Sequence, residues 1–209
     1  MLNVLLIIFV ITLFFIGIAN RLKSYIKVLA LQGVLLFGIA IFKLTEINPY
    51  LLGFILLETV VVKAIALPWF LNRIMKRNRI TREAEPFFPN FVSLMIITVA
   101  LIVAFVLSKN ITGFADNKFF FIASITTLFT GVYISISRKK IITQVMGYMV
   151  IENGVFLFSL AVGNEMPMLV NAGILLDVFA SVFLLGIFVN KIGDLINSDD
   201  SESLSSLKD

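Results

Sequence analysis

The sequence predicts an all-α, polytopic membrane protein with seven transmembrane helices. The chain has 209 residues, of which 59% are hydrophobic, and its mean hydropathy is +1.03. Charged residues make up 14%, against about a quarter in soluble domains. Long apolar runs recur along the chain without the alternation of a membrane β-barrel. This apolar excess must face lipid, so we expect a multi-pass protein of the cytoplasmic membrane, which is the inner membrane of the cell.

The seven predicted spans follow from the length of the apolar runs, because a helix needs about 20 apolar residues to cross the hydrocarbon core. The first run is followed by Arg21 and Lys23 and has no basic segment before it. We therefore expect a retained helix rather than a cleaved signal peptide. The spans lie near 2–19, 26–43, 50–72, 88–108, 119–137, 141–163 and 169–190.

Lys and Arg predict the orientation, since they are enriched in cytoplasmic loops. The connections after the first, third and fifth spans and the segment after the last span hold 13 basic residues, and the opposite side holds 3. We therefore expect the N-terminus outside and the C-terminus in the cytoplasm. The first group is Arg21, Lys23, Lys27, Arg73, Lys76, Arg77, Arg79, Arg82, Arg138, Lys139, Lys140, Lys191 and Lys208; the second is Lys43, Lys109 and Lys118.

The chain has no Cys and no His. Thiolate-bound iron–sulfur clusters, His-bound haem or zinc, and His-based nucleophilic triads are therefore excluded. We expect no catalytic residues, no metal and no cofactor on this chain. The net charge of +4 and pI of 9.4 come from short loops, so lipid headgroups explain the basic residues better than nucleic acid does. The polar loop 73–86 is either a docking arm for a cytoplasmic partner or a topology determinant.

The third predicted span contains two buried charges, Glu58 and Lys63. A charge at bilayer depth is costly and marks a functional site by default. Five residues place these side chains about 140° apart around an α-helix, so we expect each to meet a different neighbour. Thr59 lies on the Lys63 face at i,i+4, and Pro68 removes a backbone hydrogen bond beside Lys63. The span predicts a lysine that exchanges protons or, alternatively, a static ion pair to another helix.

The sixth predicted span carries a polar cluster around Glu152. Gly147 and Gly154 are seven apart and share a face, which permits close approach of another helix. Tyr148 lies one turn before Glu152 and could donate a hydrogen bond to it, and Asn153 follows it. The pattern is compatible with Glu152 as a proton relay and, equally, with Glu152 as a partner in an interhelical hydrogen bond.

The seventh predicted span places Gly173, Asp177 and Ser181 along one stripe at i,i+4 spacing. A function for Asp177 and a packing role are again both open. Three acids and one lysine inside predicted spans would carry a charge of −2 if all were ionised. Raised proton affinities of the carboxylates or partners from another chain must resolve this imbalance.

The segment 138–154 resembles the hydrogenase-4 component E family. Its sequence, RKKIITQVMGYMVIENG, has the basic turn, the Gly-Tyr and the Glu-Asn-Gly of that family. The stretch 173–187, with Asp177 as its buried acid, and the stretch 62–68, with Lys63 and Pro68, are similar to its last and third spans. The last three spans also resemble the small subunit called NuoK in complex I and MrpC in multisubunit antiporters. Glu152 stands five residues after Gly147, whereas the complex I subunit has its acid two residues after this glycine.

The predicted spans, the polar tail and the resemblance together divide the chain into four regions. These are a three-helix membrane region with a basic cytoplasmic loop (1–86), the fourth span with an external loop (87–118), a NuoK/MrpC-like three-helix unit (119–193) and a flexible cytoplasmic tail (194–209).

The resemblance also implies a function, that of a non-catalytic subunit of a complex I-like, group 4 membrane-bound [NiFe]-hydrogenase assembly. Its partners would be antiporter-like membrane subunits and peripheral hydrogenase and iron–sulfur subunits. Lys63, Glu152 and Asp177, with Glu58, would line a proton or ion path that is coupled to redox chemistry in those partners. The supporting residues would be Thr59, Pro68, Tyr148, Asn153 and Ser181. The alternatives are a subunit of an Mrp-type sodium/proton antiporter and a purely structural scaffold.

Overall fold

The computed structural model describes residues 1–43, 49–77, 88–110, 117–138, 140–162 and 186. Within these ranges the chain forms helices and no strand. The helices are α1 (Leu2–Ile18), α2 (Leu22–Lys43), α3 (Pro49–Leu56), the π-helical segment η1 (Leu57–Ala66), α4 (Leu67–Arg77), α5 (Asn90–Asn110), α6 (Lys118–Ser137) and α7 (Ile141–Val162).

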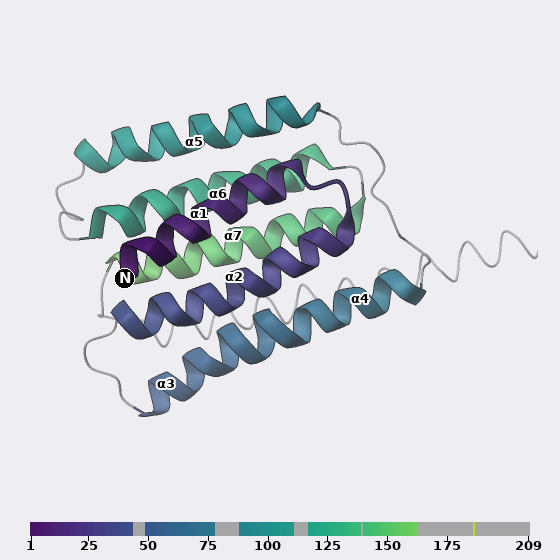
Figure 1. The fold of residues 1–209 in the computed structure, drawn as a ribbon, viewed down its shortest axis with the longest axis horizontal. Helices are drawn as coiled ribbons and strands as arrows, with labels where there is room; N and C mark the ends of the chain where they lie inside the picture. Colours follow the sequence, from purple (N-terminus) through teal and green to yellow (C-terminus); the bar gives the residue numbers. More distant parts are fainter. Residues whose placement is uncertain (44–48, 78–87, 111–116, 139, 163–185, 187–209) are drawn as a thin grey trace, which may run out of the picture.

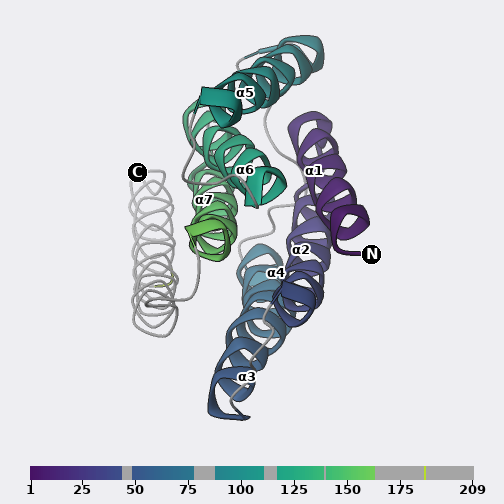
Figure 2. The ribbon, with the colours of Figure 1, turned by 90° about the vertical axis from the view of Figure 1, so that its left-hand side faces the viewer.

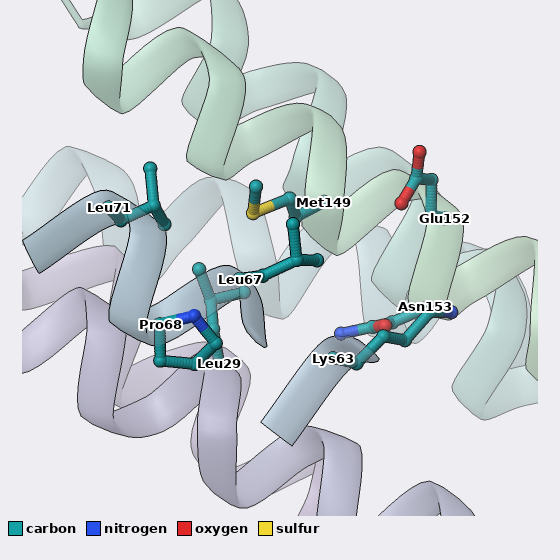
Figure 3. Close-up of a pocket in the computed structure, with 8 residues that line it drawn as sticks. All are labelled: Leu29, Lys63, Leu67, Pro68, Leu71, Met149, Glu152 and Asn153. Atoms are coloured by element: carbon teal, nitrogen blue, oxygen red, sulfur yellow. The ribbon is translucent and has the colours of Figure 1, made fainter. Parts of the chain in front are cut away.

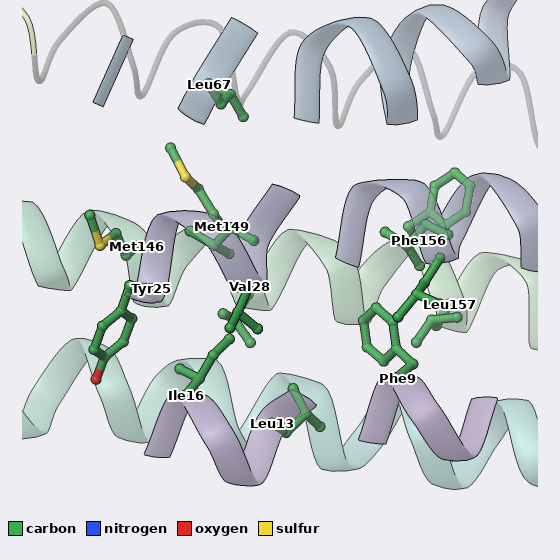
Figure 4. Packing of buried hydrophobic residues seen from close by; sticks show 14 of the residues in the cluster. Phe9, Leu13, Ile16, Tyr25, Val28, Leu67, Met146, Met149, Phe156 and Leu157 are labelled. Carbon is green, nitrogen blue, oxygen red and sulfur yellow. The ribbon is translucent and has the colours of Figure 1, made fainter. Parts of the chain in front are cut away.

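The helices form two rows with nearly parallel axes (Figure 1). Seen along the bundle, α1, α2 and the rod α3–η1–α4 make one row, and α5, α6 and α7 make the other (Figure 2). The rows meet where α1 packs on α5 and α6 and where α2 packs on α7. Figure 4 shows the apolar core of this interface, to which α1 contributes Phe9 and Leu13, α2 contributes Tyr25, and α7 contributes Met149 and Phe156.

Four of the described helices, α2, α5, α6 and α7, are long and apolar enough to cross a membrane, and α1 is a shorter apolar helix of 17 residues. Large apolar side chains are exposed along the outer faces, for example Phe91, Met95 and Ile102 on α5, as expected for helices that face lipid. The prediction of an all-helical chain with membrane-crossing helices is confirmed to this extent. The number of seven spans stays a prediction, and the seventh (169–190) lies almost wholly outside the described residues.

The third predicted span (50–72) corresponds to the longer rod Pro49–Arg77, which is π-helical in its middle. In a π-helix each N–H bonds to the carbonyl five residues earlier rather than four, and the N–H of Leu67 bonds to the carbonyl of Val62 in this way. Pro68 follows directly and has no N–H to give to the preceding turn. The sequence predicted the loss of one backbone hydrogen bond beside Lys63, and the change of helix type over Leu57–Ala66 is a feature that it did not predict.

Glycines allow close contacts between helices. A Cβ added at Gly147 of α7 would lie 2.7 Å from the backbone nitrogen of Ser135 in α6, and one added at Gly154 would lie 2.9 Å from that of Leu128. The predicted close approach along this glycine face is confirmed, with α6 as the neighbour. On α2, a Cβ at Gly33 would lie 2.7 Å from the Thr59 carbonyl oxygen, so η1 also packs backbone to backbone.

Basic residues gather at one end of the bundle. Figure 1 shows that the connection from α1 to α2, the C-terminal end of α4 and the connection from α6 to α7 all lie at the same, right-hand end. These places carry Arg21, Lys23, Arg73, Lys76, Arg138 and Lys140. Lys43, Lys109 and Lys118 lie at the opposite end, where α2 and α5 finish and α6 begins. The loops that the sequence assigned to one side of the membrane thus lie at one end of the bundle. Which end faces the cytoplasm stays a prediction.

Candidate functional site

Glu58 and Lys63 form a buried ion pair inside η1. The Lys63 Nζ lies 3.4 Å from the Glu58 Oε1, and the two residues are 5% and 0% exposed. The prediction that they point to different neighbours is wrong, because it assumed α-helical geometry. The wider turn of a π-helix, with its i→i+5 hydrogen bonds, brings residues five apart much nearer to one face than an α-helix does, and the carboxylate and the ammonium meet there.

The sequence left open a static ion pair between Lys63 and another helix, and the Glu58–Lys63 pair is not of that kind. Both charges belong to one helix, so the pair cannot tie that helix to a neighbour. Within the described residues, neither oxygen of Glu58 nor the Nζ of Lys63 has a hydrogen-bond partner. A buried ion pair repays its desolvation only when further hydrogen bonds satisfy the remaining donors and acceptors. The pair is therefore a poor structural tie, and its charges retain unused hydrogen-bonding capacity.

Lys63 also contacts α7. Its Nζ lies 5.3 Å from the centroid of the Phe156 ring, within the range of a cation–π interaction. The hydroxyl of Thr59 donates to the carbonyl of Ile55 at 2.6 Å, and the supporting role expected for Thr59 stays a prediction.

Lys63, Pro68, Glu152 and Asn153 line one cavity between α2, the η1–α4 rod and α7, with a volume of about 10 Å³. Four predicted site residues from distant parts of the sequence thus come together (Figure 3). Glu152 is 4% exposed, and its carboxylate points away from Lys63 in Figure 3. Lys63 and Glu152 thus share a cavity but form no ion pair among the described residues. The other lining residues, Leu29, Leu67, Leu71 and Met149, are apolar.

A hydrogen-bonded chain crosses the bundle behind Asn153, and the sequence did not single it out. The Nδ2 of Asn153 donates to the Oε1 of Gln32 at 3.0 Å, and the Nε2 of Gln32 donates to the Thr12 hydroxyl at 2.8 Å. Thr12 donates in turn to the carbonyl of Phe9 at 2.6 Å. Gln32 is fully buried. It is the only carboxamide in the run from Val28 to Phe42, a signal that could have revealed it.

Arg138 is a second buried group that the sequence did not reveal. We expected it in a solvated basic loop, yet it is 1% exposed. Its Nη2 donates to the carbonyl of Gly17 at 3.1 Å, and its guanidinium lies 5.6 Å from the centre of the Tyr25 ring. A cation at the C-terminus of α1 is favourable, because the last carbonyls of a helix lack intrahelical donors. Arg138 therefore fastens the α6–α7 connection to α1.

The remaining predicted site residues are less fully placed. Asp177 and Ser181 lie outside the described residues. Tyr148 is partly buried on α7, and a hydrogen bond from it to Glu152 stays a prediction. Among the residues with described positions, no group of three or more His, Cys, Asp or Glu could hold a metal ion.

The chain is similar to the uncharacterized protein Rv0085 of Mycobacterium tuberculosis. The two are 22% identical over 191 residues, which cover 90% of this chain and 87% of the relative. No family model matches the sequence, and no solved structure matches it.

Proposed function

We propose that this chain is a non-catalytic membrane subunit of a complex I-like, group 4 membrane-bound hydrogenase assembly. In this proposal Lys63, Glu58 and Glu152, with Asp177, belong to a proton path coupled to redox chemistry in partner subunits. The redox centres would sit on those partners, because this chain offers no Cys or His to bind them.

The observation that carries the proposal is the under-satisfied ion pair of η1. Two charges are buried 3.4 Å apart in an apolar helix without hydrogen-bond partners among the described residues. Ionisable groups at membrane depth are expensive and are retained for ion or proton transfer. The adjoining cavity joins Lys63 to Glu152 and Asn153 of α7, the span with the hydrogenase-like sequence. A π-helical stretch fits this proposal, since such stretches occur frequently at functional sites.

A structural scaffold is the second candidate, and one observation favours it. The chain from Asn153 through Gln32 and Thr12 to Phe9 connects α7, α2 and α1 with good hydrogen-bond geometry. Such a chain holds helices together without any need for ion movement. It does not include the charges of Glu58 and Lys63, so the scaffold explains one part of the polar interior and leaves the other unexplained.

The test is Lys63→Met in the intact assembly. Proton uptake is measured with a pH-sensitive dye in inverted membrane vesicles driven by reduced methyl viologen. We expect the variant to lose uptake, because Met keeps the length of the side chain without a titratable group. The change also leaves the Glu58 carboxylate unpaired, so uptake is compared at equal amounts of assembly that evolves hydrogen. The matched control is Lys109→Met, since the Nζ of Lys109 lies 4.7 Å from the Phe105 ring centre at an exposed position. Unchanged uptake in Lys63→Met would contradict the proposed path.

The chains that co-purify with this protein distinguish the assemblies. A [NiFe] large subunit among them supports the hydrogenase proposal. Antiporter subunits alone, with no viologen-driven uptake by the wild type, would identify an Mrp-type antiporter instead.

A further inference from the structure

One side of the rod Pro49–Arg77 is exposed in its C-terminal part, and its chemistry changes along the helix. Ile65 and Trp69 are 60% and 61% exposed, and the exposed side chains of Arg73 and Lys76 follow. Steps of four and three residues place Trp69, Arg73 and Lys76 on one face of an α-helix, and we term these three residues the α4 face. The exposed side thus passes from aliphatic through aromatic to basic.

The opposite side of α4 is packed against the bundle. Leu71 and Met75 are buried in the apolar core, and α4 packs on α2. This packing fixes the rotation of the helix, so the α4 face is directed out of the bundle. Figure 1 shows that α4 also continues beyond the ends of α1, α2 and α7 at the end of the bundle where basic residues gather.

The length of the rod matches this gradient to a bilayer. Tyr50 and Trp69 are 19 residues apart, which is about 29 Å at the rise of an α-helix, and the hydrocarbon core is about 30 Å thick. Tyr50 is 83% exposed, and Tyr and Trp are enriched at the two membrane–water interfaces. Interfaces at Tyr50 and Trp69 would place Arg73 and Lys76, about 6 and about 10 Å further along the helix, among the lipid headgroups.

The charge of the α4 face is complementary to a phosphate group. The Arg73 guanidinium lies 5.4 Å from the centre of the Trp69 ring, so a cation–π interaction holds it next to the indole. A guanidinium can donate two parallel hydrogen bonds to a phosphate. The sequence 73–85 has five basic and two acidic residues and therefore a net charge of +3. An exposed indole followed by two cations matches the acyl chains and the phosphate of a phospholipid.

We propose that the α4 face binds an anionic phospholipid, with the phosphate on Arg73 and Lys76 and the acyl chains along Trp69 and Ile65. A zwitterionic lipid carries a cationic group next to its phosphate, and the two basic residues repel this group. Each basic residue at an anionic membrane surface strengthens binding by about fivefold, so two predict a preference of about 25-fold. The site lies outside the proposed proton path and does not depend on the proposed function.

The fluorescence of Trp69 provides the experiment, because it is the only tryptophan of the chain. The full chain is reconstituted in phosphatidylcholine vesicles that contain equal fractions of either phosphatidylcholine or phosphatidylglycerol with brominated acyl chains. Bromine quenches an indole that it contacts, so the quenching curves give the relative affinity of the two lipids. We expect brominated phosphatidylglycerol to quench Trp69 at a much lower fraction of the lipid than brominated phosphatidylcholine.

Two variants and a matched control assign the preference to the face. Arg73→Gln should lower the preference by about fivefold, and Arg73→Gln/Lys76→Gln should abolish it. The control is Lys109→Gln, which removes one positive charge from an exposed cation–aromatic pair with Phe105 at the opposite end of the bundle. This control should keep the wild-type preference.

Three results would overturn the proposal. Equal quenching by the two lipids in the wild type would show that the α4 face does not select a lipid, and would favour the docking of a cytoplasmic protein there. A preference that survives in Arg73→Gln/Lys76→Gln would show that these residues do not hold the phosphate. A preference that Lys109→Gln lowers as much as Arg73→Gln would show attraction by the charge of the whole protein rather than a site on α4.

Discussion

A double-mutant cycle on Glu58 and Lys63 tests the geometry of η1. Two unit charges 3.4 Å apart attract by about 5 kcal/mol at an effective dielectric constant of about 20. In an α-helix the same side chains would stand about 10 Å apart on different faces, and the attraction would fall to about 2 kcal/mol. The measured coupling between the two positions therefore reports whether the helix is π-helical.

The expected results follow from burial. Glu58→Leu or Lys63→Met alone leaves an unpaired buried charge and should destabilise the protein by about 3–5 kcal/mol. The double variant Glu58→Leu/Lys63→Met replaces both charges by apolar groups and should be close to the wild type in stability, or above it. Thermal unfolding of the full chain in detergent measures the four proteins. A double variant that is destabilised by the sum of the single changes would refute the π-helical pairing.

Two further predictions concern packing. Gly147→Ala should destabilise the chain by about 1–3 kcal/mol in the same unfolding assay, since the added Cβ would lie 2.7 Å from the Ser135 backbone nitrogen. Gly53→Ala, where a Cβ meets nothing within 4 Å, should be neutral or slightly stabilising, and equal effects of the two changes would contradict the close α6–α7 contact. Gln32→Leu should cost about 2–6 kcal/mol because it strands two buried partners at about 1–3 kcal/mol each; a neutral outcome would remove the hydrogen-bonded chain from the account.

The parts of the fold that the sequence predicted well depend on the length of apolar runs. The run 119–137 became α6 and the run 141–163 became α7 with ends displaced by a residue or so, because the bilayer sets the length of a spanning helix. The glycine face of α7 was also foreseen, since seven residues make nearly two α-helical turns. Such features follow from local periodicity, which a sequence displays directly.

The parts that could not be predicted depend on helix type and on long-range contacts. The angle between Glu58 and Lys63 around the helix was calculated with 3.6 residues per turn. A spacing of five residues does not by itself indicate a π-helix. Gln32 was overlooked because a neutral amide costs less in a membrane than a charge, so it stands out less. The burial of Arg138 depends on the Gly17 carbonyl, 121 residues away in the sequence. The predicted role of Asp177 stays a prediction.

The two polar systems of the interior differ in how completely they are paired, and this difference separates structure from function. In the hydrogen-bonded series from Asn153 through Gln32 and Thr12 to Phe9, each side chain donates a hydrogen bond to the next residue at 2.6–3.0 Å. Such a series suits a rigid connection between helices. Glu58 and Lys63 carry full charges yet make no hydrogen bond within the described residues. Selection for stability alone would favour apolar residues at these two positions. Their presence next to a cavity that Lys63 shares with Glu152 is the feature of the interior on which the proposed path rests.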